Sequence, residues 1–235
     1  MSMSINKKHS DQDGFTLIEL LMVVLLLSII VGAVFSQIER AQVRYKVEDQ
    51  KIDLTQQERE FIDQFTRDLH QAGYPSIAVF GGQFGLNSSR IAAGVWSISQ
   101  TDLRMEGDVD GTGVQTVEYS YFDGAGWPGP GLNPCPCLRR SAAPKFDGIA
   151  PSAQVAGAAF TQVQNVVPLA TQPIFSAYDA TGAPVDISTT ITNPTKLAQI
   201  KSVQITVTTQ GLANDSDVHN TIQVSMTGMA RLVNN

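Results

Sequence analysis

One acidic residue, Glu19, lies inside the most apolar stretch of the chain. This stretch, residues 14–34, reads GFTLIELLMVVLLLSIIVGAV, and about twenty apolar residues are enough to cross a bilayer as a helix. A carboxylate in hydrocarbon costs several kcal/mol unless another group neutralises it. We therefore expect Glu19 to have a positively charged partner, and we treat it as the first candidate for a functional residue.

The two cysteines, Cys135 and Cys137, are separated only by Pro136. In an oxidising compartment they either form a disulfide across a very tight ring, near the limit of unstrained geometry, or remain two free thiols. The bridge is favoured because the chain has no other cysteine. A metal site needs more ligands than this pair provides, and a redox site more often has two residues between its cysteines.

Residues 106–113, EGDVDGTG, form an acidic segment in which Asp108 and Asp110 precede glycines. Carboxylates two residues apart occur in loops that bind Ca²⁺ through carboxylate and carbonyl oxygens. The segment lacks the full ligand spacing and the distal Glu of an EF-hand loop. An acidic hairpin turn is therefore favoured over a calcium site.

The sequence contains no residue pattern typical of catalysis. His9, His70 and His219 are far apart, and there is no G-x-S-x-G motif, phosphate-binding glycine loop or zinc motif. We predict that the chain is not an enzyme and needs no cofactor. Trp96 and Trp127 are candidate exposed anchors for a ligand. Trp96 is interpreted as a core residue instead, and Trp127 stays open between the two roles.

Charge and composition restrict the class of protein further. The 235 residues are 43% hydrophobic and 16% charged, with a net charge of -6, enough for one sizeable core besides the apolar stretch. A nucleic-acid-binding protein would need a basic face, so we expect no nucleic acid among the partners of this chain. Lys7 and Lys8 precede the apolar stretch, which places the N-terminus in the cytoplasm and the remainder outside. No small-residue cleavage pattern follows the stretch, so we expect it to be retained.

Residues 14–19, GFTLIE, together with the basic segment before them, resemble the N-terminal motif of type IV prepilins and type II secretion pseudopilins. The resemblance implies that a prepilin peptidase cleaves between Gly14 and Phe15 and methylates Phe15 at its new N-terminus. It also implies a partner for Glu19, namely the N-terminal ammonium of a neighbouring subunit in the filament. Two opposite charges are tolerated together where a single buried charge would not be.

Three weaker motifs resemble those of PilW-type minor pilins: FTRDLHQAGY at 65–74, DVDG at 108–111 and VEYSY at 117–121. This resemblance implies a minor pilin that helps to initiate or cap a type IV pilus. Its implied partners are other minor and major pilins, the prepilin peptidase and the inner-membrane assembly platform. The implied location is the bacterial inner membrane, with the C-terminal domain in the periplasm, and then the pilus. The alternatives are a J-type pseudopilin of a type II secretion system and a membrane-anchored adhesin or ligand-binding ectodomain.

A single long helix is expected to position Glu19. Residues 15–35 would form its membrane or filament-core half, after a leader at 1–14, and residues 36–73 an amphipathic half. In the second half, apolar residues recur three and four positions apart: Leu54, Phe61, Phe65 and Leu69, with Glu58 on the same face and Val43, Val47 and Ile62 beside it. Gly73 and Pro75 supply the stop signal.

Residues 74–235 are expected to form a β-sheet domain. Strands are predicted at 77–80, 95–99, 102–106, 116–122, 202–209 and 221–232, with a short strand near 175–178, and the Gly- and Pro-rich segment 124–136 should be a loop. The fold class is α+β: a long N-terminal helix packed on one antiparallel sheet. Its outline resembles the type IV pilin fold.

Overall fold

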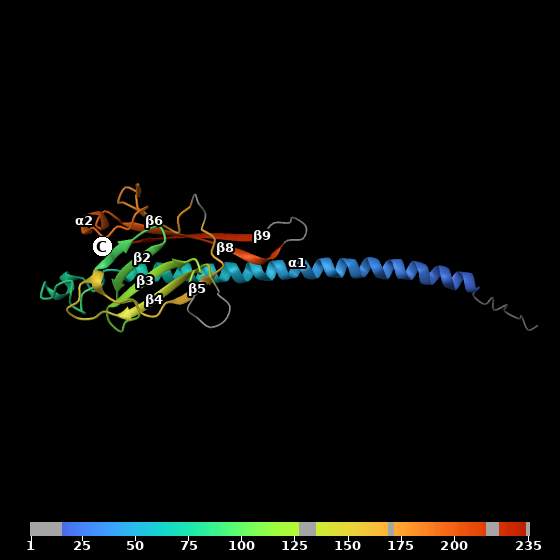
Figure 1. Ribbon diagram of the computed structural model, residues 1–235, viewed down its shortest axis with the longest axis horizontal. Coiled ribbons are helices and arrows are strands. Elements are labelled where there is room, and N and C mark those ends of the chain that lie inside the picture. Colours follow the sequence, from blue (N-terminus) through green and yellow to red (C-terminus); the bar gives the residue numbers. More distant parts are fainter. Residues whose placement is uncertain (1–15, 127–134, 169–171, 215–220, 234–235) are drawn as a thin grey trace, which may run out of the picture. The chain divides into compact units, whose positions relative to one another are not determined.

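The computed structural model describes residues 16–126, 135–168, 172–214 and 221–233. The chain forms two compact units, Met1–Lys46 and Val47–Asn235. Helix α1 (Leu17–Gln71) begins in the first unit and continues into the second (Figure 1). The predicted leader at 1–14 and the predicted N-terminal residue Phe15 lie outside the described residues, as do Trp127 and His219.

In the first unit, the apolar half of α1 is exposed on all sides. Its leucines, isoleucines and valines are all exposed, from 78% at Leu17 to 41% at Val31. Among the described residues, α1 is the one helix long and apolar enough to cross a membrane. So large an apolar surface has to be covered by lipid or by other protein chains.

In the second unit, the last turns of α1 bury one face, as the spacing predicts. The buried residues are Val47, Leu54, Glu58, Phe61, Ile62, Phe65, Asp68 and Leu69, whereas Val43, in the first unit, is exposed. The helix ends at Gln71, and Gly73 has a φ of 79°, a left-handed conformation that glycine adopts without strain. The predicted stop signal is therefore confirmed.

Five strands form the first sheet, a meander in the order β1-β2-β3-β4-β5. All neighbours pair antiparallel. The strands are β1 (Gly94–Ile98), β2 (Asp102–Gly107), β3 (Gln115–Phe122), β4 (Cys137–Pro144) and β5 (Phe160–Gln164). The first three confirm the predicted strands at 95–99, 102–106 and 116–122.

A second antiparallel sheet has the order β7-β6-β8-β9. Its strands are β6 (Phe175–Tyr178), β7 (Pro184–Val185), β8 (Ser202–Asn214) and β9 (Thr221–Arg231). The C-terminal hairpin of β8 and β9 was predicted. Short helices η1 (Ile77–Phe80), η2 (Pro151–Ala153) and α2 (Pro194–Leu197) lie in the connections.

Three features of the domain differ from the prediction. The strands form two sheets where a single sheet was expected, although the α+β class, with a long N-terminal helix packed on antiparallel strands, is confirmed. Residues 77–80 form η1, because Val79 and Gly81 donate their amides to Ser76 and Ala78 within the turn, so no strand partner is needed there. Strands β4 and β5 were not predicted, because polar Arg139 and Arg140 obscure the alternation of β4.

One core lies between the two sheets and α1. The ring centroid of Phe65 lies 5.2 Å from that of Tyr119 in the first sheet and 5.8 Å from that of Phe175 in the second. Residues from α1 and both sheets belong to one buried cluster. The second half of α1 is thus part of the folding core of the domain.

Candidate functional site

Glu19 lies in the first turn of α1, where its side chain takes part in capping the helix N-terminus. The backbone N–H and the hydroxyl of Thr16 donate to Glu19 Oε2 at 3.0 and 2.9 Å, and the Glu19 N–H donates to Thr16 Oγ1 at 3.3 Å. This reciprocal pattern is a capping box, which satisfies amides that the first helical turn leaves unpaired. Sequence reasoning found Glu19 but missed this local partner, although the T-x-x-E spacing signals it.

The capping box places a carboxylate at the head of an exposed apolar helix. A negative charge at a helix N-terminus is favourable, and a cation near this turn would meet an oriented acceptor. The predicted N-terminal residue, Phe15, directly precedes Thr16 in sequence. The predicted charge pair of Glu19 with another subunit therefore remains a hypothesis.

Asp68 joins the end of α1 to the first sheet. Its Oδ2 accepts hydrogen bonds from the Tyr119 hydroxyl at 2.7 Å and from Arg140 Nε at 2.8 Å, and Arg140 Nη2 lies 2.7 Å away. Burial raises the pKa of Tyr119, and the Asp68 charge raises it further. The sequence motifs contained Asp68 and Tyr119, but nothing in the sequence indicated that Arg140 of β4 completes the group.

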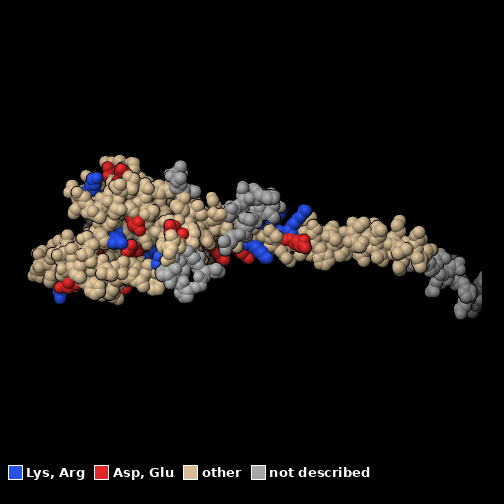
Figure 2. Space-filling view, in the orientation of Figure 1, with Lys and Arg blue, Asp and Glu red and all other residues tan. Residues whose placement is uncertain are grey.

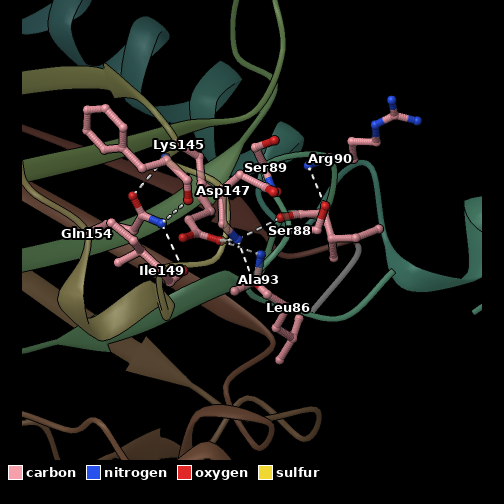
Figure 3. A network of polar contacts seen from close by, with 12 residues as sticks. Leu86, Ser88, Ser89, Arg90, Ala93, Lys145, Asp147, Ile149 and Gln154 are labelled. Carbon is pink, nitrogen blue, oxygen red and sulfur yellow. Dashed lines mark hydrogen bonds and ion pairs between the residues drawn. The ribbon is translucent and has the colours of Figure 1, made fainter. Parts of the chain in front are cut away.

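A second buried ion pair, between Glu106 of β2 and Lys145 directly after β4, holds the segment that leads into β1. Lys145 Nζ lies 2.6 Å from Glu106 Oε2 and donates to the carbonyls of Leu86 and Ile91, and Ala93 N–H donates to the same carboxylate. Figure 3 shows Lys145 beside Leu86 and Ala93. Burial raises the pKa of Glu106, while the Lys145 hydrogen bond lowers it. The arrangement fixes loop geometry, which a buried ion pair can do even where its stability gain is small.

Glu58 is the third buried acid, on the α1 face that packs against β8. Its side chain is fully buried, and Thr209 Oγ1 donates to Oε1 at 2.8 Å. Oε2 has no hydrogen-bond partner among the described residues. Burial raises the pKa of Glu58 to about 7, although the hydrogen bonds from Thr209 lower it. Glu58 therefore holds a proton more firmly than an exposed glutamate does.

The remaining candidate residues serve the local structure. Cys135 and Cys137 are joined by a disulfide. Asp108 Oδ1 accepts from the amides of Gly111 and Gly113, and Asp110 Oδ1 accepts from the amide and hydroxyl of Thr112. These bonds close the turn between β2 and β3. Within the described ranges, no group of three or more His, Cys, Asp or Glu side chains could hold a metal ion.

Neither Trp96 nor His70 contributes to a reactive cluster. Trp96 is half-buried in β1, with the Arg104 guanidinium 5.6 Å from its ring centroid. His70 is exposed in the last turn of α1. Figure 2 shows Lys and Arg interspersed with Asp and Glu on the visible face of the second unit, with no continuous basic face.

Comparison with known proteins gives one match, at the N-terminus. A model of the prokaryotic N-terminal methylation motif matches residues 9–35. No curated protein and no solved structure matches the chain. The motif and the exposed apolar start of α1 support a type IV pilin-like protein of a pilus or pseudopilus, anchored in the inner membrane. In general terms, the motif implies processing by prepilin peptidase and assembly with other pilins.

Proposed function

We propose that this chain is a minor pilin, processed by prepilin peptidase, that helps to initiate or cap a type IV pilus. The observation that carries the proposal is the N-terminal methylation motif over residues 9–35, with Glu19 at the head of an exposed apolar helix. Cleavage after Gly14 would leave Phe15 as the methylated N-terminus. Residues 15–35 would then anchor the subunit in the inner membrane.

Assembly exchanges lipid for protein around the apolar half of α1. Its side chains are exposed among the described residues, so close packing against neighbouring helices can replace the lipid contacts. Glu19 enters the same low-dielectric surroundings and pairs with the N-terminal ammonium of an adjacent subunit. A charge that stayed alone there would cost several kcal/mol. The role is structural, and the domain of β1–β9 faces outward.

The proposal is tested in two steps, beginning with the N-terminus. Mass spectrometry of the chain from cells that assemble pili should show Phe15 as the first residue, carrying one added methyl group. A chain that retains its leader would refute the proposal.

The second step replaces Glu19 with glutamine. Glu19→Gln keeps an acceptor for the Thr16 amide, so the helix start should survive while the charge pair is lost. We expect the variant to disappear from the sheared pilus fraction yet remain in the membrane. Glu39→Gln, an exposed residue of the same helix, is the matched control and should assemble normally. Normal assembly of Glu19→Gln would contradict the charge-pair mechanism.

Deletion separates the pilus role from the secretion role. Loss of a minor pilin should reduce the number of pili while protein export continues. A deletion strain that keeps its pili but stops exporting proteins would identify the secretion pseudopilin instead.

A further inference from the structure

Strand β9 is an end strand whose outer edge carries unpaired backbone groups. It pairs with β8 in an unbroken register from Gln210↔Gln223 to Ser202↔Arg231. The Leu232 amide donates to the carbonyl of Lys201, so it points toward β8. Along a strand, the N–H and C=O groups of successive residues point alternately to the two sides. The N–H and C=O groups of alternate residues therefore face away from β8. These residues are Gln223, Ser225, Thr227, Met229 and Arg231.

The β9 edge lacks the features that usually protect an end strand. It contains no proline and no charge before Arg231, and its bulge lies outside the stretch facing Gln223–Arg231. Among the described residues, no backbone hydrogen bond reaches the outer side of β9. Long, flat, uncharged edges promote pairing with another chain, so β9 presents a surface for an additional strand.

Strand β5 is an end strand of the other sheet. It pairs with β4, and its sequence, FTQVQ, contains neither charge nor proline. Beyond β5, Asn165 accepts from the Gln210 amide of β8, so only Phe160–Gln164 retains an open edge. In Figure 1, β9 is drawn above α1 and β5 below it.

The directions of the two edges are opposite relative to α1. A Cβ on Gly211 would touch both Gln50 and Ile222, and one on Gly228 would touch Ile62. As α1 advances from Gln50 to Ile62, β9 advances from Ile222 to Gly228, so the two run in the same direction.

Strand β5 runs the other way along α1. Gly107 lies against Gln71 and pairs with Gln115, the first residue of β3. Further along β3, Tyr119 contacts Phe61, so β3 runs back along the helix. Because β4 is antiparallel to β3 and β5 to β4, β5 has the direction of β3.

We propose that β9 of one copy pairs antiparallel with β5 of a second copy whose α1 points the same way. The inference rests on the proposed function, because subunits of a filament share one polarity, and it adds that two copies of this minor pilin lie next to each other. It joins two different edges, so the contact is heterologous and can be repeated along a helical array. Antiparallel pairing brings the end of β9 against the start of β5. There, Met229 is 56% exposed and Phe160 is 66% exposed, so both edges carry apolar surface at this end.

Crosslinking between two variants of the full chain tests the pairing. One population carries Thr227→Cys and the other Gln162→Cys, both reconstituted in phospholipid vesicles and treated with a short thiol-specific crosslinker. We expect a mixed dimer when the populations are combined, and little dimer from either population alone. Dimers from Thr227→Cys alone would show that β9 pairs with itself, and the absence of mixed dimers would show that β5 is not its partner. Either result overturns the proposal.

A proline substitution tests whether the backbone makes the contact. The Ser225 amide faces outward, so adding Ser225→Pro to the Thr227→Cys chain removes an outer donor and leaves the β8 ladder intact. Ser225→Ala is the matched control, because both changes remove the Ser225 hydroxyl that lies 3.0 Å from Thr208 Oγ1. Proline should lower the mixed dimer about tenfold, and alanine should leave it unchanged. Equal yields from both variants would refute backbone pairing.

Failure of this inference is distinguishable from failure of the proposed function. A chain with a methylated Phe15 that enters pili without giving the mixed dimer would overturn the strand pairing alone. A mixed dimer from chains that keep their leader in pilus-forming cells would overturn the minor-pilin assignment and leave the strand pairing standing.

Discussion

Replacing Glu58 with glutamine should remove a pH-dependent loss of stability. The folded-state pKa of Glu58 is raised from 4.5 to about 7, so the folded chain binds this proton more tightly than the unfolded chain. The stability that the protonated group permits is fully present below about pH 4.5 and is lost as the pH rises through about 7. At about 1.4 kcal/mol per pKa unit, the loss is on the order of 3 kcal/mol. Glu58→Gln stays neutral and keeps an acceptor for Thr209.

Denaturant unfolding of the full chain in mild detergent measures this difference. The free energy of unfolding of Glu58→Gln should match the parent near pH 4 and exceed it by on the order of 3 kcal/mol near pH 8. Glu60 is exposed and lies two residues after Glu58 on α1. The free energy of unfolding of Glu60→Gln should equal that of the parent at every pH. If parent and Glu58→Gln keep parallel pH profiles, Glu58 is not the buried proton-binding group that its surroundings indicate.

Two further substitutions test the packing of the domain. Lys145→Met leaves Glu106 without its cation and should lower the free energy of unfolding by about 3–5 kcal/mol. Adding Glu106→Leu to this variant should restore much of the lost stability. Additive losses of the two substitutions, measured by denaturant unfolding, would contradict the pairing. Gly228→Ala places a methyl group against Ile62 of α1 and should destabilise the domain by about 1–3 kcal/mol. Thermal unfolding measures this change. An unchanged midpoint temperature would show that β9 does not approach the helix so closely.

The helix was predictable because its signals are local. Twenty apolar residues, the T-x-x-E spacing at Thr16 and Glu19, the apolar recurrence from Leu54 to Leu69 and the stop at Gly73 each act within a few turns. The structure shows the same helix from Leu17 to Gln71. Glu58 fits this pattern too, since an acid on an apolar face indicates a buried carboxyl.

Strands β4 and β5 were missed because their polar residues are explained only by distant partners. Arg139 lies over the Phe122 ring with its guanidinium carbon 4.6 Å from the centroid, and Arg140 binds Asp68 from α1. Both side chains interrupt the alternation that identifies a strand in sequence. Conversely, residues 77–80 have β-forming side chains but form η1, because strand propensity depends on having a neighbouring strand.

The sequence by itself determined the long apolar helix, its capping residues, its amphipathic continuation and the C-terminal hairpin, because each depends on the order of neighbouring side chains. The tertiary structure decided that the strands divide into two sheets. It also decided that Lys145 finds Glu106 and that Arg140 finds Asp68, and it left the outer edges of β9 and β5 open. These features depend on which segments, distant in sequence, contact one another around α1. The free energy gained by burying side chains determines those contacts, and it is gained only when the whole domain packs.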